Sequence, residues 1–159
     1  MTRRHDMRGR AIGAGRHVRL YEWFLASEAW QSLDSVARSL YIEVARRYRG
    51  PDSNNGKIPY SVREAAMLLR VGKTTANKAF LMLIDRGFIV LKQDSGFNRK
   101  GRVAREWLLT EFADDTRARS TPTKEFMRWR PGISFNSAPT GTDSAPAGTE
   151  MYPVRDAAA

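Results

Sequence analysis

Cysteine is absent from the sequence, and histidine is represented only by His5 and His17. Without cysteine the chain can form no disulfide, thiolate nucleophile or iron–sulfur site, and the two histidines have a spacing that fits no metal site. The longest apolar runs, such as residues 79–84, fall far short of the roughly 20 residues of a membrane-spanning helix. We therefore expect no metal, no cofactor and no membrane partner, and a cytoplasmic location.

Groups for catalysis are equally scarce. Residues 72–74 (Gly-Lys-Thr) match the end of a Walker A phosphate loop, but Met67 occupies the place of the loop's first glycine, and a predicted helix precedes the segment where a strand is needed. Asp114 and Asp115 lie at the edge of the predicted domain, where we expect a solvated linker rather than an acid–base pair. The sequence thus predicts a protein that is not an enzyme.

Basic residues, by contrast, are abundant. The 159 residues include 27 Lys and Arg against 17 Asp and Glu, a formal net charge of +10. Residues 1–19 hold six basic residues and one acidic residue, and residues 70–105 hold nine and two, whereas residues 113–159 hold six of each. A local excess of this kind favours a polyanionic partner, which we expect to be nucleic acid.

Composition divides the chain into three parts. Residues 1–17 are rich in Arg and Gly without an apolar period, and they predict a basic flexible arm. Residues 18–112 contain the periodic apolar segments of a folded domain. Residues 113–159 predict a linker and a largely disordered tail, which a short aromatic–basic segment at residues 123–130 interrupts.

The first long helix of the domain is predicted over residues 34–49, where apolar residues recur at i, i+3 and i+4. Ser32 is the expected N-cap, and a Gly-Pro pair ends the helix. Residues 57–60 then predict a short strand. Pro59 places this strand at a sheet edge, because proline lacks the N–H that a central strand donates.

Two shorter helices follow, separated by a three-residue break. The first covers residues 62–69 and starts from the capping box of Ser61 and Glu64. The second covers residues 73–85, has an apolar face of its own, and ends before Gly87.

A β-hairpin is predicted after these helices. Residues 88–91 and 105–110 are rich in apolar residues that favour strands, and the polar, glycine-bearing residues 93–101 form a long basic loop between them. The expected fold class is therefore mainly α with a small β-hairpin.

Two helices joined by a tight turn, then a strand, a basic loop and a second strand, follow the order of a winged helix-turn-helix. Residues 83–89 (Leu-Ile-Asp-Arg-Gly-Phe-Ile) resemble the Leu-x-x-x-Gly-hydrophobic-Ile segment of winged-helix DNA-binding proteins. These include bacterial regulators and plasmid or phage replication proteins. The resemblance is close over residues 61–110 and looser over the rest of the domain.

The resemblance places the second helix of the motif, residues 73–85, in the DNA major groove, and the basic wing, residues 92–105, on the backbone or in the minor groove. Lysines there neutralise phosphates or reach guanine, an asparagine pairs with adenine, and threonines contact phosphate or a thymine methyl group. The candidate DNA-binding residues are Ser61, Arg63 and Arg70 around the first helix, Lys73, Thr74, Thr75, Asn77 and Lys78 on the second, and Arg99, Lys100 and Arg102 in the wing.

Some apolar residues do not fit a solvated helix face. Leu81, Met82 and Ile84 point outward if the opposite face of residues 73–85 is buried, so another element must cover them. Packing by the aromatic residues of segment 21–30 is the simpler explanation. A homodimer is the other.

Aromatic residues outside the predicted domain raise a similar question. Phe126, Met127 and Trp129 are too few for a core of their own, so they either dock on the domain or bind a protein partner. Phe97, at the wing tip, is expected to pack on the hairpin rather than to wedge between bases.

We therefore expect a sequence-specific double-stranded DNA-binding protein that acts as a transcriptional regulator and associates with the nucleoid. The alternative is a replication or maintenance factor of a plasmid, phage or other mobile element, which the sequence does not separate from a regulator. A third interpretation is a protein-interaction module that uses the winged helix without DNA, in which case the basic helix face and loop are merely solvated.

Overall fold

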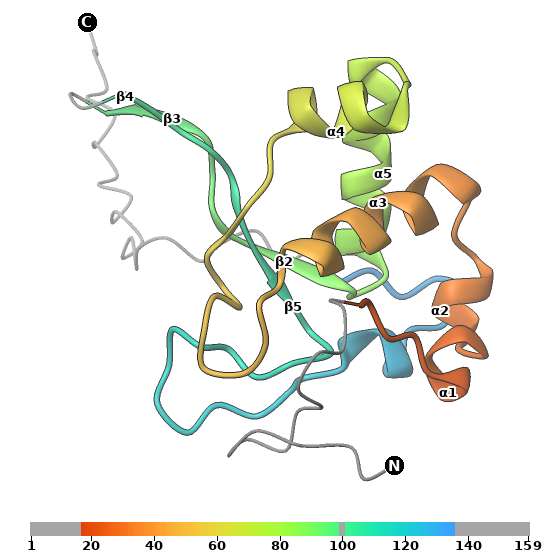
Figure 1. The fold of residues 1–159 in the computed structure, drawn as a ribbon. Coiled ribbons are helices and arrows are strands. Elements are labelled where there is room, and N and C mark those ends of the chain that lie inside the picture. Colours follow the sequence, from red (N-terminus) through yellow and green to blue (C-terminus); the bar gives the residue numbers. More distant parts are fainter. Residues whose placement is uncertain (1–16, 99–100, 136–159) are drawn as a thin grey trace, which may run out of the picture.

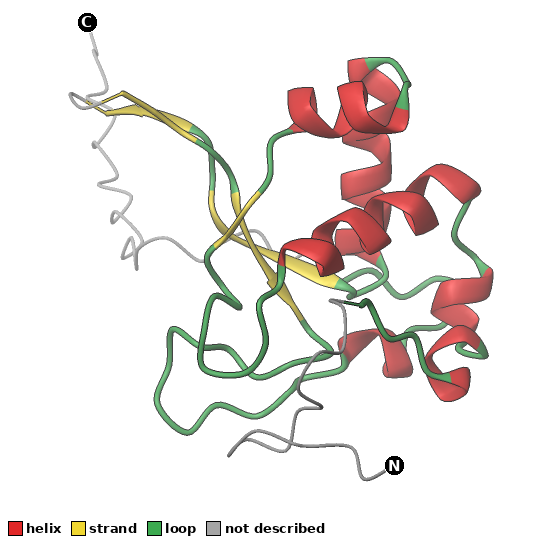
Figure 2. Ribbon diagram, in the orientation of Figure 1, coloured by secondary structure: helices red, strands yellow, loops and turns green. Residues whose placement is uncertain are grey.

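A computed structural model describes residues 17–98 and 101–135, without the side chains of residues 97–103. Over these residues it contains five α-helices, one 3-10 helix and a three-stranded antiparallel sheet from which a two-stranded hairpin projects (Figures 1 and 2). The predicted helix-rich domain with a small antiparallel β component is confirmed at this level. The predicted arm up to residue 16, and the tail from residue 136, lie outside the described residues.

Three helices come first in the described chain: α1 (Glu22–Leu25), α2 (Glu28–Gln31) and α3 (Ser35–Arg47). The predicted cap of the third was wrong. Asp34, not Ser32, is its N-cap, and its carboxylate accepts a hydrogen bond from the Ala37 amide at 2.7 Å. The helix ends two residues before the predicted bound, because Tyr48 is extended and the Asn54 side-chain amide takes over the last helical carbonyl.

Helices α4 (Val62–Leu69) and α5 (Lys73–Asp85) have the predicted bounds. The hydroxyl of Ser61 accepts a hydrogen bond from the Glu64 amide at 3.1 Å, as the capping box requires of an N-cap serine. The buried face of α5 consists of Ala76, Ala79, Phe80, Leu83 and Ile84. Contacts with α3 and α4 cover this face, so the three longest helices form one layer beside the sheet (Figure 1).

The sheet has the order β1-β5-β2, with β1 (Ile58–Pro59), β2 (Ile89–Gln93) and β5 (Glu106–Leu109) all antiparallel. Pro59 lies on an edge strand, as predicted. The predicted long loop was wrong in part. Its middle is a second antiparallel pair, β3 (Gly96–Asn98) and β4 (Gly101–Val103), which extends the hairpin away from the helices.

The core contains an aromatic cluster, which consists of Phe24, Trp30, Tyr41, Phe88 and Phe126. Its ring centroids lie 4.8 to 5.9 Å apart in the pairs that contact one another. Phe126 comes from a short 3-10 helix, η1 (Glu125–Arg128), and is 1% exposed. The predicted domain boundary at residue 112 is therefore too early: residues 113–135, hereafter the strap, pack on the domain.

Docking of the strap also decides between the two explanations of its aromatic residues. Phe126 and Trp129 are buried against the domain, whereas Met127 is 40% exposed. Docking is therefore the alternative that the structure shows for the two buried aromatics, whereas a protein partner that binds at Met127 stays a prediction.

The strap is fastened by its acidic residues. Asp115 accepts hydrogen bonds from the backbone amides of Asp52, Ser53 and Asn55, and Asp114 forms an ion pair with Lys92 at 3.0 Å. The expected solvated linker was wrong here, because the turn before β1 presents amides that need an acceptor.

Apolar residues at the back of α5 are covered by the chain itself. Ile84 is buried in the hydrophobic core that also contains Phe24 and Trp30. Met82 is partly buried against this core, whereas Leu81 is 55% exposed. Contacts within one chain thus bury Ile84 and partly bury Met82. For these two residues this agrees with the simpler explanation, packing within the chain.

Candidate nucleic-acid interface

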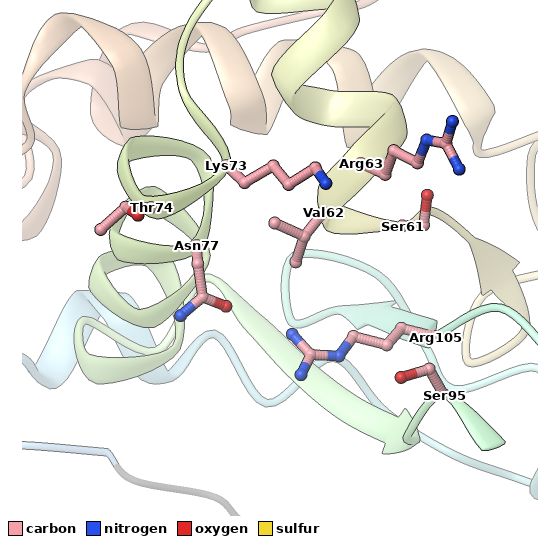
Figure 3. Close-up of a pocket in the computed structure, with 8 residues that line it drawn as sticks. All are labelled: Ser61, Val62, Arg63, Lys73, Thr74, Asn77, Ser95 and Arg105. Carbon is pink, nitrogen blue, oxygen red and sulfur yellow. The ribbon is translucent and has the colours of Figure 1, made fainter.

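An open pocket of about 530 Å³ lies where the N-termini of α4 and α5 meet the base of the projecting hairpin. Figure 3 shows side chains from all three elements directed toward this space. Its lining residues are Ser61, Val62, Arg63, Lys73, Thr74, Asn77, Ser95 and Arg105. Five of the candidate DNA-binding residues thus line one pocket.

The start of α4 supplies the first side of the pocket. Ser61 caps the helix, and Arg63 is exposed on its first turn. The neighbouring acid is directed elsewhere, since the Glu64 carboxylate forms an ion pair with Arg47 of α3 at 2.6 Å. Arg63 therefore keeps its guanidinium toward solvent at the pocket rim (Figure 3).

The turn between α4 and α5 supplies the second side. Arg70 ends α4 in the left-handed conformation (φ 55°, ψ 42°), and the Val71 amide donates to the Ala66 carbonyl at 3.0 Å. This tight C-terminal closure brings Lys73 beside the start of α4. Gly72, the N-cap of α5, provides no side-chain cap, so the first amides of α5 remain available to an anion.

Four exposed cations surround the pocket or continue from it, and we call them the cationic face: Arg63, Arg70, Lys73 and Lys78. Over the described part of the chain, none of the four forms an ion pair with a carboxylate. Elsewhere, basic residues such as Arg86 and Lys92 do pair with neighbouring acids. The cationic face therefore carries positive charge that the described residues do not neutralise.

The remaining candidates lie outside the pocket. Thr75 is exposed on α5, and Lys78 lies one turn after Thr74, on the same side of the helix. Arg99 and Lys100 lie outside the described residues. The Arg102 backbone pairs with Phe97 in the outer hairpin, and the two side chains are outside the described part, so the expected packing of Phe97 stays a prediction.

Arg105 is the pocket residue of clearest chemical interest that the sequence did not suggest. It lies just before β5, and its Nε donates to Oδ1 of Asp94 at 2.8 Å. This hydrogen bond is the main cause that lowers the pKa of Asp94. The signal available in the sequence was weak, because an acid in the predicted loop and a base at the start of the next predicted strand can be paired only if the register of the hairpin is known.

Other kinds of site are not built by the described residues. They contain no group of three or more acidic or histidine side chains that could hold a metal ion, and none of their helices has the length and apolarity to cross a membrane. Comparison with known protein families, curated proteins and solved structures gives no match to this chain. The chemistry of the pocket and of the cationic face must therefore be inferred from the chain's own residues.

Proposed function

We propose that the chain is a sequence-specific double-stranded DNA-binding protein of the winged-helix type that acts as a transcriptional regulator. The observation that carries this proposal is the cationic face: four exposed cations on α4, on the turn after it and on the first half of α5, without carboxylate partners among the described residues. An exposed surface of this charge fits the phosphates of a duplex.

The order of the elements supports this assignment. Helix α3, strand β1, helices α4 and α5, and then a hairpin with a projecting tip occur in the order of a winged helix. In the proposed complex α5 enters the major groove by its N-terminal half, α4 crosses the backbone, and the tip formed by β3 and β4 is the wing.

Each side chain of α5 then has a chemically suitable contact. Lys73 and Lys78 neutralise phosphates, and the free amides behind Gly72 add donors to one of them. Asn77 is half-buried in the pocket wall, which restricts its amide and suits a bidentate contact with adenine. No catalytic step is proposed.

The test is duplex binding as a function of salt concentration. Fluorescence anisotropy with a random-sequence duplex should give an affinity that falls steeply with KCl, and Lys73→Gln should reduce the slope of log K against log salt by about 0.9, the contribution of one phosphate. Lys124→Gln is the matched control, because it removes the same charge from the residue that precedes η1. A salt-independent affinity would instead support a protein-interaction module, and equal slopes for the two variants would contradict the phosphate contact of Lys73.

Sequence preference and biological role need a second measurement. Genome-wide mapping of bound sites should return a common motif upstream of genes if the protein is a regulator. Binding confined to repeated sites at a replication origin would contradict the role as a transcriptional regulator and support that of a replication or maintenance factor. Scattered binding without a motif would contradict specificity.

A further inference from the structure

We infer that Arg105 is a DNA-phosphate contact at the base of the wing, and that Asp94 is the residue that positions it. This inference rests on the proposed function. It adds one phosphate contact and its positioning residue, both outside the cationic face. Its basis is the placement of the two residues across the hairpin, beside the starts of α4 and α5.

The register of the hairpin sets the pair opposite each other. Gln93 of β2 pairs with Glu106 of β5 after a register shift between Leu91 and Gln93, so the next residues toward the tip are Asp94 and Arg105. Their side chains meet through a hydrogen bond of 2.8 Å between Nε and Oδ1. Asp94 also accepts a hydrogen bond from the Ser95 amide at 2.6 Å, which fixes its carboxylate.

The backbone of Arg105 is held as firmly as its side chain. Its carbonyl accepts a hydrogen bond from the Tyr60 amide at 3.0 Å, and the Tyr60 carbonyl accepts one from the buried Trp107 indole at 2.8 Å. Because Tyr60 directly precedes the cap of α4, Arg105 cannot move far from Ser61 without breaking the edge of the sheet. The guanidinium is therefore preorganised beside the cationic face.

A guanidinium offers more donors than one carboxylate uses. With Nε engaged by Asp94, the two terminal nitrogens point into the pocket toward Asn77 (Figure 3). Two parallel N–H groups of this kind match two oxygens of a phosphate, a geometry that lysine cannot reproduce. Asp94 acts here as the acid that orients an arginine, while the arginine carries the contact.

Four variants test the inference on one duplex over a KCl series. Arg105→Gln should weaken binding roughly tenfold and reduce the salt slope by about 0.9, as expected for one lost phosphate contact. Arg105→Lys should restore the salt slope but only part of the affinity, because lysine restores the charge but not the two parallel N–H groups of the guanidinium. Asp94→Asn should weaken binding about threefold even though it makes the protein more positive, because an amide no longer holds the guanidinium as firmly. Arg117→Gln, an exposed arginine of the strap, should leave both quantities unchanged.

The results separate this inference from the proposed function. If Lys73→Gln weakens binding and Arg105→Gln behaves like Arg117→Gln, the inference is overturned and the function stands. If Lys73→Gln and Arg105→Gln are both without effect, the proposed function fails as well. Tighter binding by Asp94→Asn would show that the carboxylate only repels phosphate, which overturns its positioning role. Thermal unfolding of each variant verifies that the compared proteins are folded.

Discussion

The aromatic cluster and the cationic face lie at opposite ends of α5. The side chains of the first are shielded from solvent, whereas those of the second are exposed. In the aromatic cluster, rings from α1, α2, α3, η1 and the residue before β2 exclude solvent, and the strap closes over them. On the cationic face, charged groups are exposed and lack carboxylate partners among the described residues. This small domain therefore buries its aromatic cluster at one end of α5 and exposes its cationic face at the other, where a ligand can reach it.

The acids of the chain sharpen the same contrast. Asp114 and Asp115 of the strap are used internally, and Glu64 beside the cationic face is drawn toward α3 by Arg47. We therefore expect substitutions in the aromatic cluster to lower the free energy of unfolding without altering DNA contacts. Substitutions on the cationic face should remove DNA contacts without lowering the free energy of unfolding.

The largest effect is expected from Phe126→Ala. Phe126 stacks on Phe88 at 4.8 Å and is buried, so its truncation should lower the free energy of unfolding by about 3–5 kcal/mol. Urea denaturation followed by tryptophan fluorescence measures the loss, and its neighbour Met127→Ala should change stability by less than about 1 kcal/mol. Equal, small effects for the two variants would mean that the strap does not dock.

A second large effect is expected where the strap joins the sheet. The buried side chain of Asn55 donates to the carbonyls of Leu109, Phe112 and Ala113, and accepts from the Leu109 amide. Asn55→Ala leaves these groups without partners and should lower the free energy of unfolding by about 2–3 kcal/mol.

The adjacent Asn54→Ala provides the control for this prediction. Asn54 is half-buried, and its side chain bonds the last carbonyl of α3 and the nearby Arg49 amide and Ser53 hydroxyl, so the loss should be nearer 1 kcal/mol in the same urea experiment. A loss as large as that of Asn55→Ala would place the important connection at α3 rather than at the strap.

Local signals explain why the helices around the pocket were predicted well. The cap at Ser61 and the glycine after α5 act within a few residues, so α4 and α5 have the predicted bounds. Gly87 serves two purposes: its φ is +73°, and a Cβ there would lie 2.8 Å from the Cβ of Glu125. The sequence indicated the first role, because glycine commonly ends a helix. No neighbouring residue indicated the second, the close approach of Glu125.

Contacts between distant segments explain what was missed. Phe126 lies in a stretch of polar composition, and its burial depends on Phe24 and Phe88, which are far away in the sequence. The pairing of Asp94 with Arg105 depends on a register shift that periodicity does not reveal. Side chains placed by helix periodicity could therefore be assigned to the pocket, whereas those placed by strand register could not.

A smaller effect is expected from Glu111→Gln, and it depends on pH. Burial raises the pKa of Glu111, whose carboxylate accepts a hydrogen bond from the buried Tyr41 hydroxyl at 2.7 Å. Between the usual pKa of 4.5 and the raised value, the folded state binds the proton more often than the unfolded state, so the free energy of unfolding falls as pH rises through that window. Glu111→Gln retains an acceptor and lacks this proton, so its stability relative to the parent should rise over the same window.

Urea titrations at a series of pH values give this difference. The exposed Glu22→Gln is the control, and its stability curve should run parallel to that of the parent across the window. A parallel curve for Glu111→Gln as well would contradict the proton linkage.

The smallest effect on stability should have the opposite sign. Arg70 and Arg119 both adopt the left-handed conformation, with φ of 55° and 56°, which disfavours any side chain with a Cβ. Replacing either by glycine relieves roughly 1–2 kcal/mol of strain against a chain-entropy cost of about 0.5–1 kcal/mol, so each variant should gain about 0.5–1 kcal/mol. The two variants also lose the same charge, but only Arg70 belongs to the cationic face, since Arg119 lies in the strap, which follows β5 in the chain. DNA affinity and its salt slope should therefore fall for Arg70→Gly and stay unchanged for Arg119→Gly. Equal losses in both would mean that overall charge, rather than the place of each cation, determines binding.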